Sequence, residues 1–100
     1  MQANPTALAF VDPEISGPGT AWDCAQVRRL ARRLGYELLW PPEDSALPLA
    51  DLARELDVDA VIVPAATHLD FATVDALTRV CEIECAQPPL TYTRRAVRYA

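Results

Sequence analysis

Lysine is absent from this sequence, and all nine basic residues are arginine. Fourteen acidic residues outnumber them and give a formal net charge of −5 and a sequence pI of about 4.6. Proteins that bind nucleic acid unaided rely on positive charge to hold the phosphate backbone. The overall charge therefore makes free-standing nucleic-acid binding a poor hypothesis. Arginine-only usage, with abundant alanine and proline, is typical of a high-GC bacterial genome.

Long apolar segments are lacking as well. No run approaches the roughly 20 residues that a membrane helix needs, and the first residues lack the basic-then-apolar pattern of a secretory signal. We therefore expect a soluble, cytoplasmic protein with no membrane partner. The composition of the 100 residues, 51% hydrophobic and 23% charged, predicts one globular domain over 1–100, with a frayed lead at 1–6 and a tail at 94–100.

Metal-binding motifs are missing too. The three cysteines, Cys24, Cys81 and Cys85, form no CxxC pair, and His68 is the only histidine. Cys81 and Cys85 share one face if their segment is helical. Two thiols without further ligands are more typical of buried apolar positions than of a zinc site. We expect no disulfide framework, no metal and no cofactor.

Hydrophobic patterning predicts four strands alternating with three helices. Continuous apolar runs, typical of strands covered on both faces, occupy 7–11 and 60–63, and shorter strand patterns occupy 36–40 and 90–93. Apolar residues at helical spacing predict helices that begin near Thr20, Pro48 and Thr73, the last with a stripe that continues to Cys81. The order βαβαβαβ predicts an α/β fold, a small three-layer sandwich with a mainly parallel four-stranded sheet. The segment 90–93 is expected at an edge, where a second copy can pair with it.

The first predicted helix has the clearest signals. Thr20 and Asp23 resemble a capping box, and Gly35 stands where a helix-ending glycine belongs. Its apolar stripe consists of Val27, Leu30, Ala31 and Leu34. The opposite face holds a candidate interaction patch, the arginine patch, made of Arg28, Arg29, Arg32 and Arg33. This patch is either a solvated face neutralised by nearby acids or a contact for an acidic partner or a phosphate backbone.

Three segments resemble the N-terminal catalytic domain of the resolvase/invertase family of serine recombinases, over roughly 7–93. The segment Leu8-Ala9-Phe10-Val11-Asp12 is similar to that family's first strand, and 22–36 to its first helix and the Gly-Tyr step into strand two. The segment 52–77, which includes Asp59-Ala60-Val61-Ile62-Val63 and Ala66-Thr67-His68-Leu69, is similar to its third strand and the region beyond. The resemblance implies a resolvase-like order of elements.

The departures from that family concern its chemistry. Asp12 stands at the position of the nucleophilic serine, Phe10 at that of an arginine, and Thr67-His68 at that of an Asp-Arg pair. Attack on a phosphodiester requires the nucleophile and cationic groups that hold the phosphoryl oxygens. We therefore expect no recombinase catalysis. The resemblance then implies a non-catalytic bacterial regulatory or accessory domain that acts through protein association, as a homodimer or with another protein.

Polar residues follow the predicted strands, where ligands of parallel sheets gather. This rim consists of Asp12, Glu14, Ser16, Trp40, Thr67, His68 and Asp70. An acid near a lone histidine can act as a base or hold a cation, and Ser16 near His68 can imitate a hydrolase pair. Solvated loops are polar for simpler reasons. Two alternatives to association stay open: a small-ligand or metal-binding domain or enzyme at Asp12 and His68, and a nucleic-acid accessory protein that uses the arginine patch.

Overall fold

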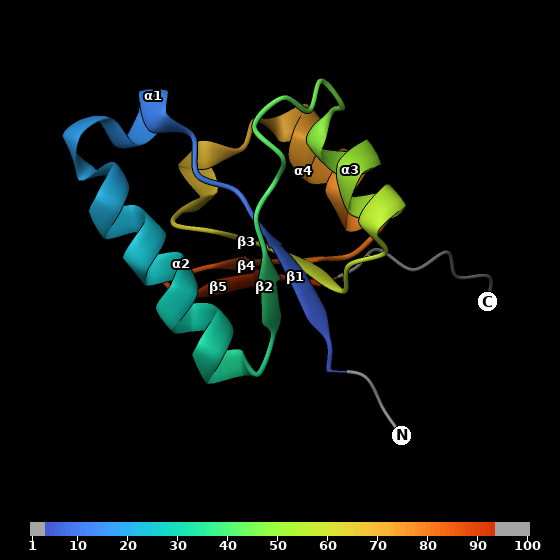
Figure 1. Cartoon of the computed structure of the whole chain (residues 1–100), viewed down its shortest axis with the longest axis horizontal. Helices are drawn as coiled ribbons and strands as arrows, with labels where there is room; N and C mark the ends of the chain where they lie inside the picture. Colours follow the sequence, from blue (N-terminus) through green and yellow to red (C-terminus); the bar gives the residue numbers. More distant parts are fainter. Residues whose placement is uncertain (1–3, 94–100) are drawn as a thin grey trace.

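A five-stranded sheet organises the chain (Figure 1). The computed structural model describes residues 4–93, so the tail predicted at 94–100 lies outside the described residues. The strands lie in the order β2-β1-β3-β4-β5. Their bounds are β1 Thr6–Ala9, β2 Glu37–Leu39, β3 Ala60–Val63, β4 Glu82–Cys85 and β5 Leu90–Tyr92. All pairs are parallel except β4 with β5. The predicted α/β class and mainly parallel sheet are confirmed, and β5 lies at an edge, but the prediction of four strands is wrong.

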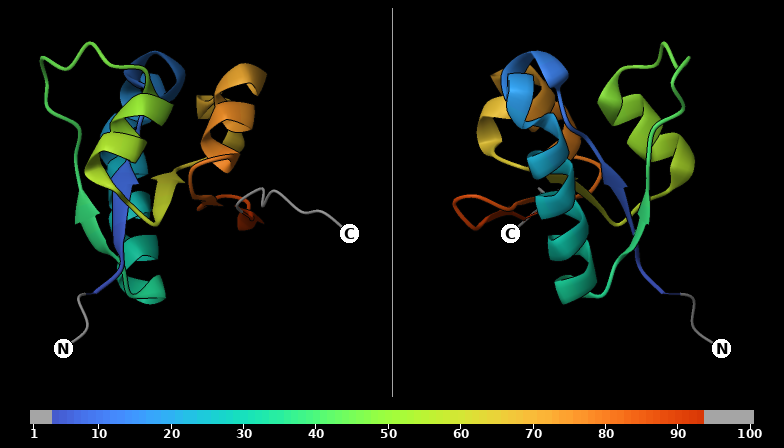
Figure 2. Two further views of the ribbon diagram at one scale, coloured as in Figure 1. Left: turned by 90° about the vertical axis from the view of Figure 1, so that its right-hand side faces the viewer. Right: turned by 60° about the vertical axis from the view of Figure 1, so that its left-hand side comes forward.

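Helices cover both faces of the central strands (Figure 2). On one face α2 (Thr20–Leu34) packs Val27, Leu30 and Ala31 against alanines and Ile62 of β1 and β3. On the other face α3 (Leu49–Leu56) and α4 (Phe71–Thr78) pack against Leu8, Val61 and Val63. Every residue of β3 is fully buried, which explains why its sequence is apolar at each position rather than at alternate ones.

The connection from β1 to α2 is more regular than the loop predicted there. A short helix, α1 (Pro13–Ser16), and a 3-10 turn, η1 (Gly17–Gly19), lead directly into α2. The predicted capping box is wrong, because the Thr20 hydroxyl donates to the carbonyl of Gly17 and Asp23 bonds to a different hydroxyl. The helix ends as predicted at Gly35, whose φ of 83° is left-handed.

The helix predicted to begin near Thr73 is shorter in the structure than its apolar stripe predicts. The helix ends at Thr78, and the chain enters β4 instead of continuing through Cys81. Partly exposed glutamates alternate with buried Ile83 and Cys85 along β4, which is the period of a strand. Cys81 and Cys85 therefore share the buried face of an extended segment, not one face of a helix.

The frayed lead predicted at 1–6 is also too long, since Thr6 opens β1. Its amide donates to the Asp59 carboxylate at 2.9 Å, and the Pro5 carbonyl accepts from the amide of Glu37 at 2.8 Å. These bonds hold the chain at the start of β1 against its two neighbouring strands.

The α2 face of the sheet is only partly covered. The main contacts of α2 are with β2 and β3, and the hairpin of β4 and β5 extends beyond the helix (Figure 2). A hairpin needs no crossover helix, so within residues 4–93 no helix follows β4 to cover this part of the sheet. We call the α2-side surface of β4 and β5 the open sheet face. It carries Glu82, Glu84 and Thr91.

The packing of α2 gives a matched pair of substitutions. Leu30 is 5% exposed and Leu34, one turn later, is 43% exposed. Leu30→Ala should lower the free energy of unfolding by about 2 to 4 kcal/mol because it leaves a cavity between helix and sheet. Leu34→Ala should cost less than about 1 kcal/mol. Urea unfolding measures both, and equal losses would mean that a different face of α2 is buried.

Candidate functional site

A hollow lies at the carboxyl ends of β1 and β3, the two central strands. From β1 the chain passes to α2 on one face of the sheet, and from β3 it passes to α4 on the other. Parallel sheets bind ligands where neighbouring strands diverge in this way. The hollow has a volume of about 390 Å³. Its walls include Ile15, Ser16, Trp22, Asp23, Thr67 and His68.

His68 forms the floor of this strand-end hollow. It ends η2 (Ala66–His68), and its side chain is only 3% exposed. Its Nδ1 atom accepts a hydrogen bond of 2.9 Å from the backbone amide of Asp12. Because Nδ1 is an acceptor, the proton of the neutral ring is on Nε2. The bond joins the segment after β3 to the segment after β1, so the histidine also holds the two sides of the hollow together.

Asp23 lies between Ser16 and His68. Its Oδ2 atom accepts a 2.5 Å hydrogen bond from the Ser16 hydroxyl and lies 3.6 Å from Nε2 of His68. In hydrolases the histidine takes the proton of the serine and the acid orients the histidine. Here the hydroxyl is bonded to the carboxylate, so the three side chains do not form the hydrolase arrangement that the sequence suggested for Ser16 and His68.

The other predicted rim residues have structural partners or face elsewhere. The Asp12 carboxylate accepts from the amide of Glu14 at 3.0 Å and begins α1, and Glu14 is exposed. Thr67 lines the hollow from η2. Asp70 begins α4 by accepting from the amide of Thr73 at 2.7 Å, so the prediction of Thr73 as the capping residue is wrong. Ser16, Thr67 and His68 therefore lie around the hollow. Asp12 is connected to them only by the hydrogen bond from its backbone amide to His68.

Two lining residues had not been assigned to the site from the sequence. The sequence places Asp23 in a capping box and shows no pattern that assigns Trp22 to the rim. Trp22 is 63% exposed and lines the hollow. The available signal was their place in the first turn of the helix that follows the first strand, the turn that faces the strand ends.

The described residues, 4–93, contain no group of side chains placed to bind a metal ion, and two of the three cysteines are buried. No three side chains among the described histidines, cysteines, aspartates and glutamates are grouped so that they could hold a metal ion. Cys81 and Cys85 are both 2% exposed. Burial, with a smaller contribution from neighbouring Glu84, raises the pKa of the Cys85 thiol to about 11. This thiol is therefore protonated and unreactive at neutral pH.

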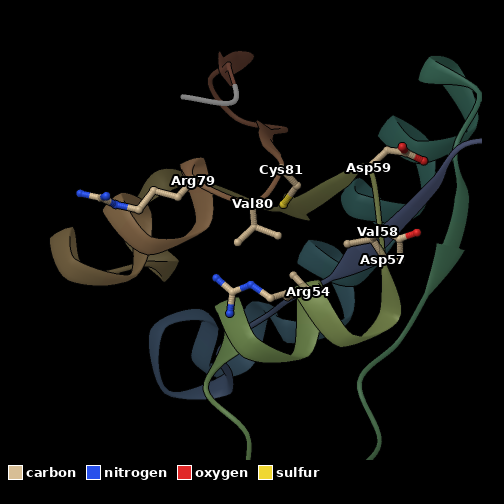
Figure 3. A pocket seen from close by; sticks show the side chains of 8 residues that line it. Arg54, Asp57, Val58, Asp59, Arg79, Val80 and Cys81 are labelled. Carbon is tan, nitrogen blue, oxygen red and sulfur yellow. The ribbon is translucent and has the colours of Figure 1, made fainter. Parts of the chain in front are cut away.

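A second hollow of about 270 Å³ lies at the opposite, amino-terminal edge of β3 and β4 (Figure 3). Its charged residues do not converge. Arg54 and Arg79 extend away from Asp57 and Asp59 in Figure 3, and each arginine pairs with an aspartate of its own helix. These exposed pairs contribute little energy, and nothing in the geometry points to a ligand.

The arginine patch on α2 is exposed along its whole length. None of the ion pairs formed within residues 4–93 involves Arg28, Arg29, Arg32 or Arg33. The Arg28 guanidinium lies 5.1 Å from the centre of the Trp40 ring. The direct neutralisation by neighbouring acids, one of the two interpretations of this patch, is therefore not found in the described part of the chain.

Comparison with known proteins does not assign this chain to a family. No family model, no curated protein and no solved structure matches this chain. The resemblance to serine recombinases therefore stays a prediction. Within residues 4–93 there is also no helix with the length and apolarity required to cross a membrane.

The cap at Asp70 makes stability depend on pH. Hydrogen bonds from Thr73, the side chain first and then the backbone, lower the pKa of the Asp70 carboxyl from its ordinary value of 3.8. The folded state binds this proton more weakly than the unfolded state. The stabilisation is therefore complete above pH 3.8 and is lost as the pH falls through the lower, folded pKa.

Thermal unfolding followed by circular dichroism between about pH 2 and pH 7 measures this effect. Asp70→Ala should melt below the wild type at neutral pH because the cap is gone, and the difference should shrink in acid. Asp70→Asn retains an acceptor that does not titrate, so its advantage over Asp70→Ala should stay constant. A wild-type advantage over Asp70→Ala that is the same at both ends of the pH range would contradict this account.

Proposed function

We propose that this chain is a non-catalytic association domain that forms a homodimer. In this dimer the arginine patch of each copy lies against the open sheet face of the other. The observation that carries the proposal is that, within residues 4–93, the four arginines of α2 form no ion pair and the sheet surface on the α2 side bears two glutamates.

The open sheet face is acidic because of the register of β4. Ile83 and Cys85 point into the core beneath α3 and α4, so Glu82 and Glu84 face the α2 side. Thr91 stands opposite Glu84 and donates to its carboxylate at 2.6 Å. Burial, followed by the charges of Glu82 and Glu84, raises the pKa of Tyr36 just beyond α2.

The arginine patch has the complementary charge. Arginines four residues apart on one helix face repel each other by a few tenths of a kcal/mol per pair. Carboxylates from a second copy would turn this repulsion into attraction. If each copy contributes both surfaces across a two-fold axis, both contacts form together and the assembly closes as a dimer.

Aromatic side chains beside the patch provide apolar contact area. Arg28 and Arg32 line a hollow of about 350 Å³ with Tyr36, Leu38 and Trp40. Arginine, tyrosine and tryptophan are the residue types that contribute most to protein interfaces. They lie next to edge strand β2, so a partner that covers the patch also covers exposed apolar surface.

A charge-swap experiment tests the proposed dimer by sedimentation velocity. The wild type should sediment as a dimer at low salt and dissociate as about 0.5 M salt screens the contact. Arg29→Glu/Arg33→Glu and Glu82→Arg/Glu84→Arg should each be monomeric, because each places like charges face to face. An equimolar mixture of the two should restore a dimer. Arg54→Glu/Arg79→Glu makes the same change in net charge as the first variant but on other helices, and should remain dimeric.

Two outcomes would overturn this function. One is a wild type that is monomeric at about 200 μM, far above the Kd of a stable dimer. The other is a dimer that survives both charge reversals. DNA binding at low salt that is lost on replacing the four arginines would favour the nucleic-acid accessory alternative instead. Circular dichroism of each variant confirms that its fold is retained.

A further inference from the structure

We propose that the strand-end hollow binds a small organic amine in its protonated form, with Asp23 as the counter-charge. This site is separate from the proposed dimer contact, since it lies at the N-terminal end of α2 whereas the arginine patch lies toward the C-terminal end. The two proposals can therefore succeed or fail independently.

The charge of the hollow selects a cation. Asp23 is the only carboxylate among its described lining residues, and none of those residues is an arginine. A phosphate or carboxylate ligand would meet this acid, and the one basic side chain of the lining, His68, already faces the same carboxylate. An ammonium group would gain a charge-assisted hydrogen bond, which is stronger than a neutral one.

The acceptors around Asp23 suit an ammonium group, which has three hydrogens to donate. The Asp23 side chain is 24% exposed and so can be reached from the hollow. The Ser16 oxygen gives its own hydrogen to Asp23 and keeps lone pairs that can accept. Thr67 and Gln26, whose side chains carry a hydroxyl and an amide group, line the same space. An ammonium group beside Asp23 therefore finds more than one oxygen within the site.

The carboxylate is positioned before any ligand arrives. The Ser16 hydroxyl bonds to Oδ2 of Asp23, and Nε2 of His68 lies 3.6 Å from the same oxygen. The amide of Asp12 orients the histidine ring at 2.9 Å. Held by the hydrogen bond from Ser16, Asp23 loses little side-chain freedom on binding, which lowers the entropic cost of the complex.

An apolar body would complete the ligand. Trp22 and Ile15 are 63% and 51% exposed, and both line the hollow. Indole rings bind cations and aromatic rings on their faces. The volume of about 390 Å³ falls in the range of small-molecule sites. We therefore infer a primary amine that carries an aromatic or branched aliphatic group.

Three probes with the same aromatic body separate charge from shape. They are 2-phenylethylamine, which is cationic, 2-phenylethanol, which is neutral, and 3-phenylpropanoate, which is anionic. Titrations of the full chain followed by ¹H–¹⁵N NMR should show millimolar binding of the amine, with shifts in the amides of 15–26 and 64–68. The alcohol and the carboxylate should bind at least about tenfold more weakly, a loss equivalent to one charge-assisted contact.

Substitutions assign the binding to Asp23. Asp23→Asn should weaken amine binding about tenfold and leave binding of the alcohol nearly unchanged. Asp51→Asn, which removes an exposed carboxylate from α3, should change neither. Trp22→Ala removes a largely exposed side chain and should also weaken the amine, so the inference stays testable if Asp23→Asn is poorly folded.

Two results would overturn the inference. The first is the absence of amide shifts at about 20 mM amine, well above a millimolar Kd. The second is binding that does not depend on probe charge, or that favours the carboxylate, because the hollow would then act only as an apolar cleft.

Discussion

The molecule depends on one constraint: its two central strands are apolar on both faces. Ala7, Leu8 and Ala9 of β1 and all four residues of β3 are fully buried. Such strands fold only if helices cover both sides. The chain therefore leaves β1 toward one face and β3 toward the other, and the two connections separate above the sheet. The strand-end hollow is a consequence of this separation, and the bond between His68 and the amide of Asp12 spans it.

The hairpin of β4 and β5 breaks the alternation of strands and helices. Because β5 returns antiparallel beside β4, no helix in the described part of the chain covers the α2 side of these two strands. Glu82 and Glu84 are partly exposed on that surface, whereas Ile83 and Cys85 are buried in the core on the other side of β4. The open sheet face thus originates in a sheet wider than the helix that lies on it.

The sequence predicted the elements in which the spacing of apolar residues fits only one type of secondary structure. The runs at β1 and β3, the stripe of α2 from Val27 to Ala31 and the glycine end of that helix required no tertiary information and are confirmed, whereas Leu34, the last residue of the predicted stripe, is exposed. The failure at β4 arose because Val80 and Cys81 continue the helical spacing of α4 by coincidence. The alternation Glu-Ile-Glu-Cys was the competing signal, and packing beside β3 decided in its favour.

Part of the candidate site could also be predicted from the sequence. Strand ends identify which loops meet, so Ser16 and His68 could be placed on one rim from the order of elements. The role of Asp23 could not, because local spacing fits a helix cap equally well and only the fold brings its carboxylate toward His68.

Charge is divided between two separate regions of this acidic chain. The arginines of α2 stand away from the strand ends, and the lining of the hollow in residues 4–93 includes Asp23 but no arginine. Phosphoryl chemistry needs positive charge at the reacting group, and here the positive charge lies on a helix surface instead. The same segregation that makes the strand ends unsuitable for a phosphate makes them suitable for a cation, and it leaves the arginine patch available for a carboxylate surface. The two proposed recognition surfaces thus differ in sign because the fold separates the charges that a phosphoryl-transfer site would bring together.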